Sequence, residues 1–128
     1  MAHPNEVRLQ ELYAAFAKGD LPAVLGMCAD SIQFRVPGSS PAAGTYTKGT
    51  FMDLVGKVMQ MSGGTFSEEA HTVVANDHHG AVLLTHRFRR GDVPVEYRTV
   101  HIWEIRDGLF TGFTEWPGDQ GAFDKAWS

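Results

Sequence analysis

The sequence predicts an α+β fold in which helices come first and a curled antiparallel sheet follows. Apolar residues recur at the helical period in three places before residue 63, near residues 5–18, 20–28 and 50–62. From residue 65 onward, runs of β-type residues alternate with short turns rich in Gly, Asp and Asn. Helices and strands that are segregated along the chain are typical of α+β proteins. We expect a conical sheet wrapped around three N-terminal helices.

The composition is that of one soluble globular domain, which we expect to span residues 1–128. Apolar residues make up 43% of the chain and charged residues 20%. A net charge of -4 with scattered Lys and Arg argues against a nucleic-acid partner. We find neither a signal-peptide pattern nor an apolar run of the ~20 residues that a membrane span needs. The single cysteine, Cys28, excludes an internal disulfide, so we expect a cytoplasmic protein.

The first two helices are predicted to be joined by a tight Gly-Asp link. We expect Asn5 to cap the first helix and Gly19 to end it in the left-handed conformation. Asp20 then caps a short second helix, whose buried stripe would include Cys28 as an unreactive thiol. The apolar stripe of the first helix consists of Leu9, Leu12, Tyr13 and Phe16.

One strand and one long loop separate the second helix from the third. Residues 31–36 alternate between apolar and polar, which predicts a strand with unlike faces. Residues 37–49 are rich in Pro, Gly and Ser and are interpreted as a loop, either a plain connector or the rim of a site. Thr50 and Asp53 are spaced as a capping pair for the third helix, which ends at Gly63.

The last strands form an antiparallel meander whose register decides what faces inward. A three-residue turn around Asp107 would place His101 opposite Glu115. A two-residue turn would shift the pairing by one residue and move Glu115 to the other face. In the first register, one face mixes large apolar with titratable groups, as pocket linings do. Its members are His86, Phe88, Tyr97, Thr99, His101, Trp103, Phe113 and Glu115.

Glu115 is the main candidate for chemistry, with His101 or His86 as its partner. A carboxyl and an imidazole in one pocket form a possible acid–base pair. The alternative is a structural ion pair that holds the register of the sheet. Among the other lining residues, Tyr97 and Trp103 could offer polar hydrogens to a ligand, or could simply pack in the core.

Gln33 and Arg35 share one face of the first strand, near the long loop. Inside a pocket, this arginine would recognise a carboxylate or an enolate, whereas outside it would be an ordinary surface charge. We predict no metal site, because no acid or cysteine completes a set with His78 and His79. On the other face of the sheet, Val100 and Ile102 lie among charged residues, which indicates a homodimer interface there.

The whole pattern resembles the SnoaL-like branch of the nuclear transport factor 2-like superfamily. The resemblance is carried by LQELYAAFAKGDLPAVLGMCADSIQFRVPG, by LTHRF, and by VHIWEIRDGLFTGFTEW followed by P-x-D-Q. It implies a conical α+β barrel with an apolar pocket, also called cystatin-like, that is usually dimeric and lacks a metal or cofactor. The superfamily includes ketosteroid isomerases, polyketide cyclases, epoxide hydrolases and binding proteins without catalytic activity, so fold alone does not set the activity.

The residues of the catalytic relatives carry over only in part. Ketosteroid isomerases place an aspartate base before a proline at the end of the first strand, and this chain has Val36 there. The epoxide hydrolases' Tyr, Asn, Arg and Asp positions correspond here to Gln33, Arg35, His86 and Phe88, which are chemically different. Glu115 alone matches the acid of the last strand, and polyketide cyclases also use an acidic residue in an apolar pocket.

We therefore expect a small pocket protein that binds or acts on a small apolar molecule. If it is an enzyme, it is a cofactor-independent isomerase, cyclase or hydrolase in which Glu115 moves protons with the help of a histidine. The two alternatives are a binding protein with the same pocket and no chemistry, and a dimerisation module whose cavity has collapsed.

Overall fold

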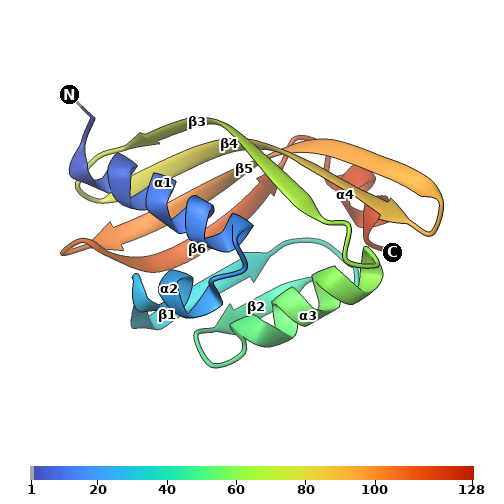
Figure 1. The fold of residues 1–128 in the computed structure, drawn as a ribbon, viewed down its shortest axis with the longest axis horizontal. Coiled ribbons are helices and arrows are strands. Elements are labelled where there is room, and N and C mark those ends of the chain that lie inside the picture. The colour runs from blue at the N-terminus through green and yellow to red at the C-terminus, as the bar shows by residue number, and fades with distance from the viewer. Residues whose placement is uncertain (1) are drawn as a thin grey trace.

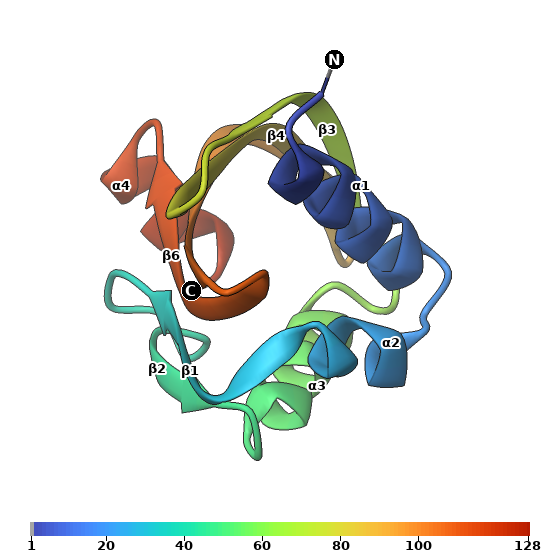
Figure 2. The same ribbon diagram turned by 90° about the vertical axis from the view of Figure 1, so that its left-hand side faces the viewer.

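The computed structural model describes residues 2–128 and has an α+β architecture, as the sequence predicts. In chain order the elements are α1 (Pro4–Ala17), α2 (Leu21–Gly26), β1 (Cys28–Val36), β2 (Gly44–Thr47), α3 (Phe51–Met61), β3 (Ser67–Ala75), β4 (His79–Arg90), β5 (Val93–Arg106), β6 (Leu109–Pro117) and α4 (Gln120–Ala126). The long strands cross the whole molecule (Figure 1). Seen from the end, the sheet curls around a central space, and α1, α2 and α3 lie along its open side (Figure 2).

The six strands form one sheet in the order β2-β1-β6-β5-β4-β3. All neighbouring strands are antiparallel except β1 and β6, which run parallel. The β3–β6 meander follows the prediction, but β2 lies within the segment that we expected to be entirely loop. Both β1 and β2 precede α3, so the helices and strands are less strictly segregated than the sequence indicates.

The helix ends follow the sequence prediction in part. Gly19 has a positive φ of 74°, and the Asp20 side chain accepts a hydrogen bond from Ala23 N, as expected of a C-terminal glycine and an N-cap. Asn5 is not the cap of α1: His3 is, because its ring accepts from the Asn5 N–H. The Asn5 side chain is buried instead and donates to the Asn76 carbonyl, which ties α1 to the β3–β4 turn.

Two further local predictions are wrong. Thr50 is the N-cap residue of α3, as expected, but the predicted side-chain cap does not form, since its hydroxyl accepts instead from the backbone N–H of Thr47. Cys28 is the first residue of β1 and not the end of α2. It is buried, and burial raises the pKa of its thiol to about 11, so the thiol stays protonated and unreactive, as predicted.

The turn between β5 and β6 has two residues, not three, yet the expected register is correct. Asp107 and Gly108 both have positive φ, and Arg106 pairs with Leu109 directly across the turn. The register then shifts between Glu104 and Ile105, which leaves one extra residue on β6. This bulge restores the pairing that places His101 opposite Glu115 and Trp103 opposite Phe113.

The core lies between the helices and the concave face of the sheet. Leu9 and Leu12 of α1 are buried there together with Phe34, Val82 and Phe110 from the sheet. At the far end α4 closes the curl, and Trp127 stacks on Phe88 with ring centroids 4.1 Å apart. In the stretch from residue 2 to 128, no helix is long and apolar enough to cross a membrane.

Candidate functional site

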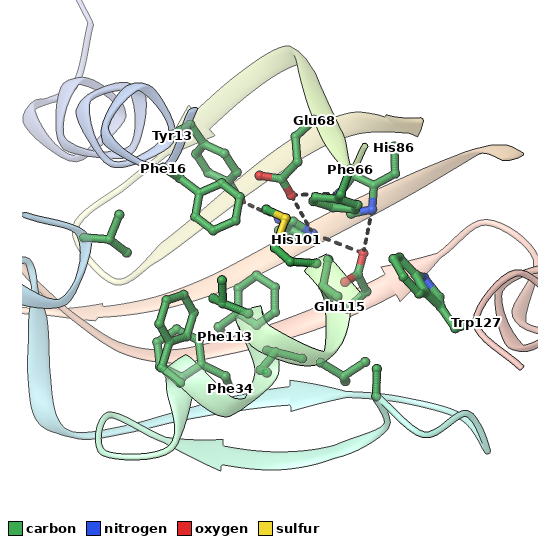
Figure 3. Close-up of a pocket in the computed structure, with 18 of the residues that line it drawn as sticks. Tyr13, Phe16, Phe34, Phe66, Glu68, His86, His101, Phe113, Glu115 and Trp127 are labelled. Atoms are coloured by element: carbon green, nitrogen blue, oxygen red, sulfur yellow. Dashed lines mark hydrogen bonds and ion pairs between the residues drawn. The ribbon is translucent and has the colours of Figure 1, made fainter. Parts of the chain in front are cut away.

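A cavity of about 110 Å³ lies between α1, α3 and the concave face of the sheet. Its lining is almost wholly apolar and rich in aromatic rings, with polar groups gathered on the sheet side (Figure 3). This combination of an apolar hollow and a few convergent polar groups is typical of small-molecule sites. The lining residues with titratable side chains are Tyr13, Glu68, His86, Tyr97, His101 and Glu115.

Most of the residues that we predicted for the pocket do line this cavity. His86, Tyr97, His101, Trp103, Phe113 and Glu115 all contribute to its wall. Phe88 and Thr99 are buried directly behind that wall, so they support the lining but do not form it. Gln33 and Arg35, which we predicted to bind a ligand, do not line this cavity. Both are exposed, and Arg35 bonds to Gln33 and pairs with Glu104 on the outer face, because Phe34 and Val36 take the inner positions of β1.

The Glu115 carboxylate is held by two donors from the neighbouring strand β5. Thr99 Oγ1 donates to Glu115 Oε2 at 2.7 Å, and His101 Nε2 lies 3.1 Å from the same oxygen. No buried side-chain oxygen or nitrogen within residues 2–128 lacks a hydrogen-bond partner. Since both bonds end on Oε2, the other oxygen, Oε1, is not fully buried. Glu115 lines the cavity, so a ligand there would meet a carboxylate that is anchored through Oε2.

The electrostatic surroundings keep Glu115 ionised. Burial raises the pKa of this carboxyl, but the nearby charge and hydrogen bond of His101 oppose burial. The charge of His86 and the hydrogen bond from Thr99 act in the same direction as His101, and the resulting pKa is about 2. At neutral pH the group is a carboxylate, the form that accepts a proton.

A tyrosine from α1 fixes the orientation of His101. Tyr13 Oη lies 2.5 Å from His101 Nδ1, and Trp103 Nε1 donates to Tyr13 Oη at 3.1 Å. An indole N–H can only donate, so the hydrogen of the tyrosine is free to go to Nδ1 of a neutral imidazole. Nε2 then carries the ring hydrogen that points at Glu115. Burial and the negative charges of Glu68 and Glu115 raise the pKa of Tyr13, so it stays a hydroxyl.

A second series of the same residue types ends at Glu68 on β3. His86 Nε2 lies 2.8 Å from Glu68 Oε2, His86 Nδ1 lies 2.9 Å from Tyr97 Oη, and Trp127 Nε1 donates to Tyr97 Oη at 2.8 Å. Burial lowers the pKa of His86, but the hydrogen bond to Glu68 and the charges of Glu115 and Glu68 outweigh it and raise the pKa. Burial and these charges likewise raise the pKa of Tyr97.

The two series converge in one cluster. His101 Nε2 lies 4.0 Å from Glu68 Oε2, and His86 Nδ1 lies 3.9 Å from Glu115 Oε2. Each imidazole is thus within ion-pair distance of both carboxylates, and Figure 3 shows Glu68 and Glu115 reaching toward His101 from different strands. Each buried carboxylate thus has one imidazole as a hydrogen-bond partner and a second imidazole nearby.

Sequence reasoning missed Glu68 and the polar role of Tyr13. Tyr13 belongs to the predicted apolar stripe of the first helix, and apolar periodicity does not show which hydroxyl group has a hydrogen-bond partner. Glu68 lies beside Glu69 near the start of β3, where two successive acids look like a solvated edge strand. Pairing the first residues of β3 with β4 in register would have found it, since Glu68 pairs with His86.

Three groups of the cluster also have the spacing of metal ligands. One atom each of Glu68, His86 and His101 lies within 4.8 Å of the other two. The Glu68 and His86 atoms already share a hydrogen bond, and His101 Nε2 bonds to Glu115. Because these contacts already use one oxygen of Glu68 and the facing nitrogens of both histidines, we describe the group as a hydrogen-bonded cluster of acids and bases.

The curled sheet, the covering helices and the enclosed cavity define a class of small pocket-forming α+β proteins. The chain belongs to the SnoaL-like domain family, whose model matches residues 9–113. The expected resemblance is therefore confirmed over most of the chain. No functionally curated protein matches it.

Several solved structures share this fold at low sequence identity. TerC, crystallised with polyporic acid, is 20% identical, with 97% of this chain and 98% of that one covered and a TM-score of 0.84. A nuclear transport factor 2-like protein of unknown function from Burkholderia pseudomallei is 18% identical, with coverages of 98% and 99% and a TM-score of 0.81. IdmH from Streptomyces antibioticus, a candidate polyketide cyclase, is 15% identical, with coverages of 91% and 93% and a TM-score of 0.74.

The pH dependence of stability tests the ionisation of Glu115. Its pKa in the folded chain, about 2, lies below the ordinary 4.5. The ionised carboxylate therefore stabilises the fold above pH ~4.5, and this contribution is lost as the pH falls toward 2. We expect the free energy of unfolding, measured by urea denaturation between about pH 5 and pH 3, to fall more steeply for the wild type than for Glu115→Gln. Equal slopes would show that Glu115 has an ordinary pKa.

Proposed function

We propose that this protein catalyses acid–base chemistry on a small, largely apolar molecule, with Glu115 as the group that takes up a proton. The observation that carries this proposal is a buried carboxylate, anchored through Oε2, in the wall of an otherwise aromatic cavity. A proton acceptor must be ionised at rest and must lie beside the ligand, and Glu115 is ionised and lines the cavity, which supports this role.

His101 assists Glu115 from behind the carboxylate. It donates through Nε2 to the oxygen that does not face the ligand, and Tyr13 keeps the ring in that orientation. The low pKa makes Glu115 a weak base while His101 carries a positive charge. It becomes a stronger base whenever the imidazole is neutral, because the opposing charge is then gone. His101 therefore sets the strength of the base.

The shape and chemistry of the cavity favour a planar, ring-containing ligand. Phe34, Phe66, Phe113 and Trp127 offer flat apolar surfaces to a ligand, and the polar groups gather on one side. An engineered apolar cavity of about 150 Å³ binds benzene, so a space of about 110 Å³ suits a small ring system. The polyporic acid of TerC and the polyketide cyclase function suggested for IdmH point to the same class of ring-containing carbonyl compounds.

Ligand binding without chemistry is the alternative function, and one observation favours it. Both Oε2 atoms of the cluster and all four imidazole nitrogens already have partners inside the protein, so a ligand could be held by the aromatic rings alone. The two functions differ in one measurable respect, since only the catalytic function requires Glu115 to exchange a proton with the ligand.

A planar carbon acid tests the role of Glu115 without knowledge of the natural substrate. In 5-nitrobenzisoxazole, a base removes the ring C–H proton next to nitrogen, the N–O bond breaks, and a nitrile and a coloured phenolate form. We expect the wild-type protein to accelerate this elimination and Glu115→Gln to lower the rate by about 100-fold or more, as for the loss of a positioned base. The absorbance of the phenolate measures the rate.

Glu11→Gln is the matched control, because it makes the same chemical change on the exposed face of α1 outside the cavity. It should leave the rate unchanged. If wild type and Glu115→Gln bind the probe equally well but react equally slowly, Glu115 is not a base and the protein is a binder.

We also propose that the protein is a homodimer formed through the outer face of the sheet. Leu83 pairs with Val100, and Val100 pairs with Trp116, so these three apolar residues form a row across three strands. Trp116 is 60% exposed and Leu83 43% exposed in the isolated chain, and Ile102 lies next to the row on β5. A second copy would remove this apolar row from water.

A charge in the middle of this row should separate the subunits. We expect the wild type to have the mass of a dimer in size-exclusion chromatography with light scattering, and Val100→Glu to have the mass of a monomer. Val93→Glu places the same charge on an exposed valine outside the row and should remain dimeric. A monomeric wild type at micromolar concentration would contradict the proposal.

A further inference from the structure

We propose that Glu68, backed by His86, is a second proton-handling group in the same cavity and donates a proton to the ligand while Glu115 accepts one. This inference rests on the proposed function and deepens it, because it adds a proton donor to a site that otherwise has one proton acceptor. A two-centred site suits a substrate whose C–H bond breaks while an oxygen elsewhere on the same molecule gains a proton.

The first argument is the position of Glu68. Its side chain is 13% exposed, lines the cavity and comes from β3, whereas Glu115 comes from β6, three places away in the sheet. Both carboxylates approach Nε2 of His101, Glu115 Oε2 at 3.1 Å and Glu68 Oε2 at 4.0 Å, and Figure 3 shows them coming from different strands. A ligand in the cavity beside this nitrogen would thus be within reach of two carboxyl groups from separate strands, so acid and base can act on different atoms of the ligand.

The second argument is the matched support of the two carboxylates. In each series a Trp donates to a Tyr, the Tyr bonds Nδ1 of a His, and Nε2 of that His bonds Oε2 of a Glu. The only hydrogen bond that the described residues give Glu68 ends on Oε2, so its Oε1 is not fully buried, by the same reasoning as for Glu115. Holding one oxygen from behind and presenting the other is how a protein positions a proton-transfer group.

The charges around His86 give the Glu68–His86 pair a different role from the Glu115–His101 pair. The titratable groups that face this ring are Glu68 on β3, Tyr97 and His101 on β5, and Glu115 on β6. The two carboxylates outweigh burial and favour the protonated ring, so the Glu68–His86 pair holds a proton that it can give. Groups whose environments favour opposite protonation states are the expected acid and base of a site.

The proposed step conserves protons within the cluster. The ligand's C–H bond breaks and its proton goes to Oε1 of Glu115, while the electron pair of that bond moves through the ligand to an oxygen atom. That oxygen takes the proton of the Glu68–His86 pair from Oε1 of Glu68, which leaves Glu68 ionised and His86 neutral with its hydrogen on Nε2. Glu115 ends with one more proton and the second pair with one fewer, so a reverse transfer at another ligand atom regenerates the resting state. The substrate class is therefore an enolisable carbonyl compound that is isomerised or cyclised without a co-substrate.

Two benzisoxazoles that differ in their need for an acid test this role. The nitro compound releases a phenolate that is stable without protonation, whereas the oxygen of unsubstituted 1,2-benzisoxazole leaves more readily when it is protonated. We expect Glu68→Gln to lower the wild-type rate about 10- to 100-fold on the unsubstituted compound and less than about 3-fold on the nitro compound. Glu115→Gln should lower both rates together, and Glu11→Gln should lower neither.

Each outcome decides between the proposals. A selective loss in Glu68→Gln supports Glu68 as the proton donor. Equal losses on the two compounds, or no loss, would overturn the inference and leave Glu115 as the single proton-handling group. If the wild type is no faster than Glu115→Gln on either compound, the proposed function fails first, and the second centre fails with it.

The wild-type protein offers a second measurement in case Glu68→Gln does not fold. The ratio of the two rates, unsubstituted over nitro, should fall as the pH rises above the raised pKa of His86, because the pair then loses the proton that it donates. A structural role for His86 would change both rates equally and leave the ratio constant. A constant ratio between about pH 6 and pH 9 would overturn the inference.

Discussion

The pairing of β5 with β6 is the constraint on which the site depends, because it brings Glu115 beside His101. A carboxylate buried this deeply is stable only with hydrogen-bond donors and a compensating charge, and the neighbouring strand supplies both through Thr99 and His101. One extra residue on β6 decides whether this happens, since the two-residue turn alone would point Glu115 outward. The bulge is thus as important for the chemistry as the carboxylate itself.

The same constraint explains why an apolar cavity can contain six titratable side chains. The imidazoles of the cluster are hydrogen-bonded on the side away from the carboxylates. Tyr13 bonds His101 and is itself bonded by Trp103, and Tyr97 bonds His86 and is itself bonded by Trp127. These four aromatic residues pack as hydrophobic groups and use their single polar atoms to orient the imidazoles. The result is a rigid polar wall with two carboxylates, each anchored through one oxygen, facing rings that give a ligand shape but no hydrogen bonds.

The sequence was sufficient for the fold and for half of the site. Period-two alternation identified the inward face of β4, β5 and β6, and hence His86, His101 and Glu115, because every second residue of a strand shares a face. It was insufficient where an element's partner decides the role of a residue. Tyr13 became part of the site only because α1 lies against the sheet, and Glu68 only because β3 pairs with β4 in one register. Gln33 and Arg35 alternate with buried Phe34 and Val36, so the same periodicity that found Glu115 could have excluded them.

The most direct test of the account is the position of the ring hydrogens on His86 and His101, measured by proton–nitrogen correlation NMR of the wild-type protein. Each Trp–Tyr–His–Glu series requires Nε2 of its histidine to carry a hydrogen that bonds to the glutamate, whether the ring is neutral or charged. We expect both histidines to show protonated Nε2 atoms whose signals persist through slow solvent exchange, and His86→Asn and His101→Asn to remove one signal each. Neutral rings with the hydrogen on Nδ1, or rapidly exchanging Nε2 hydrogens, would contradict the two supported carboxylates on which the proposed chemistry is built.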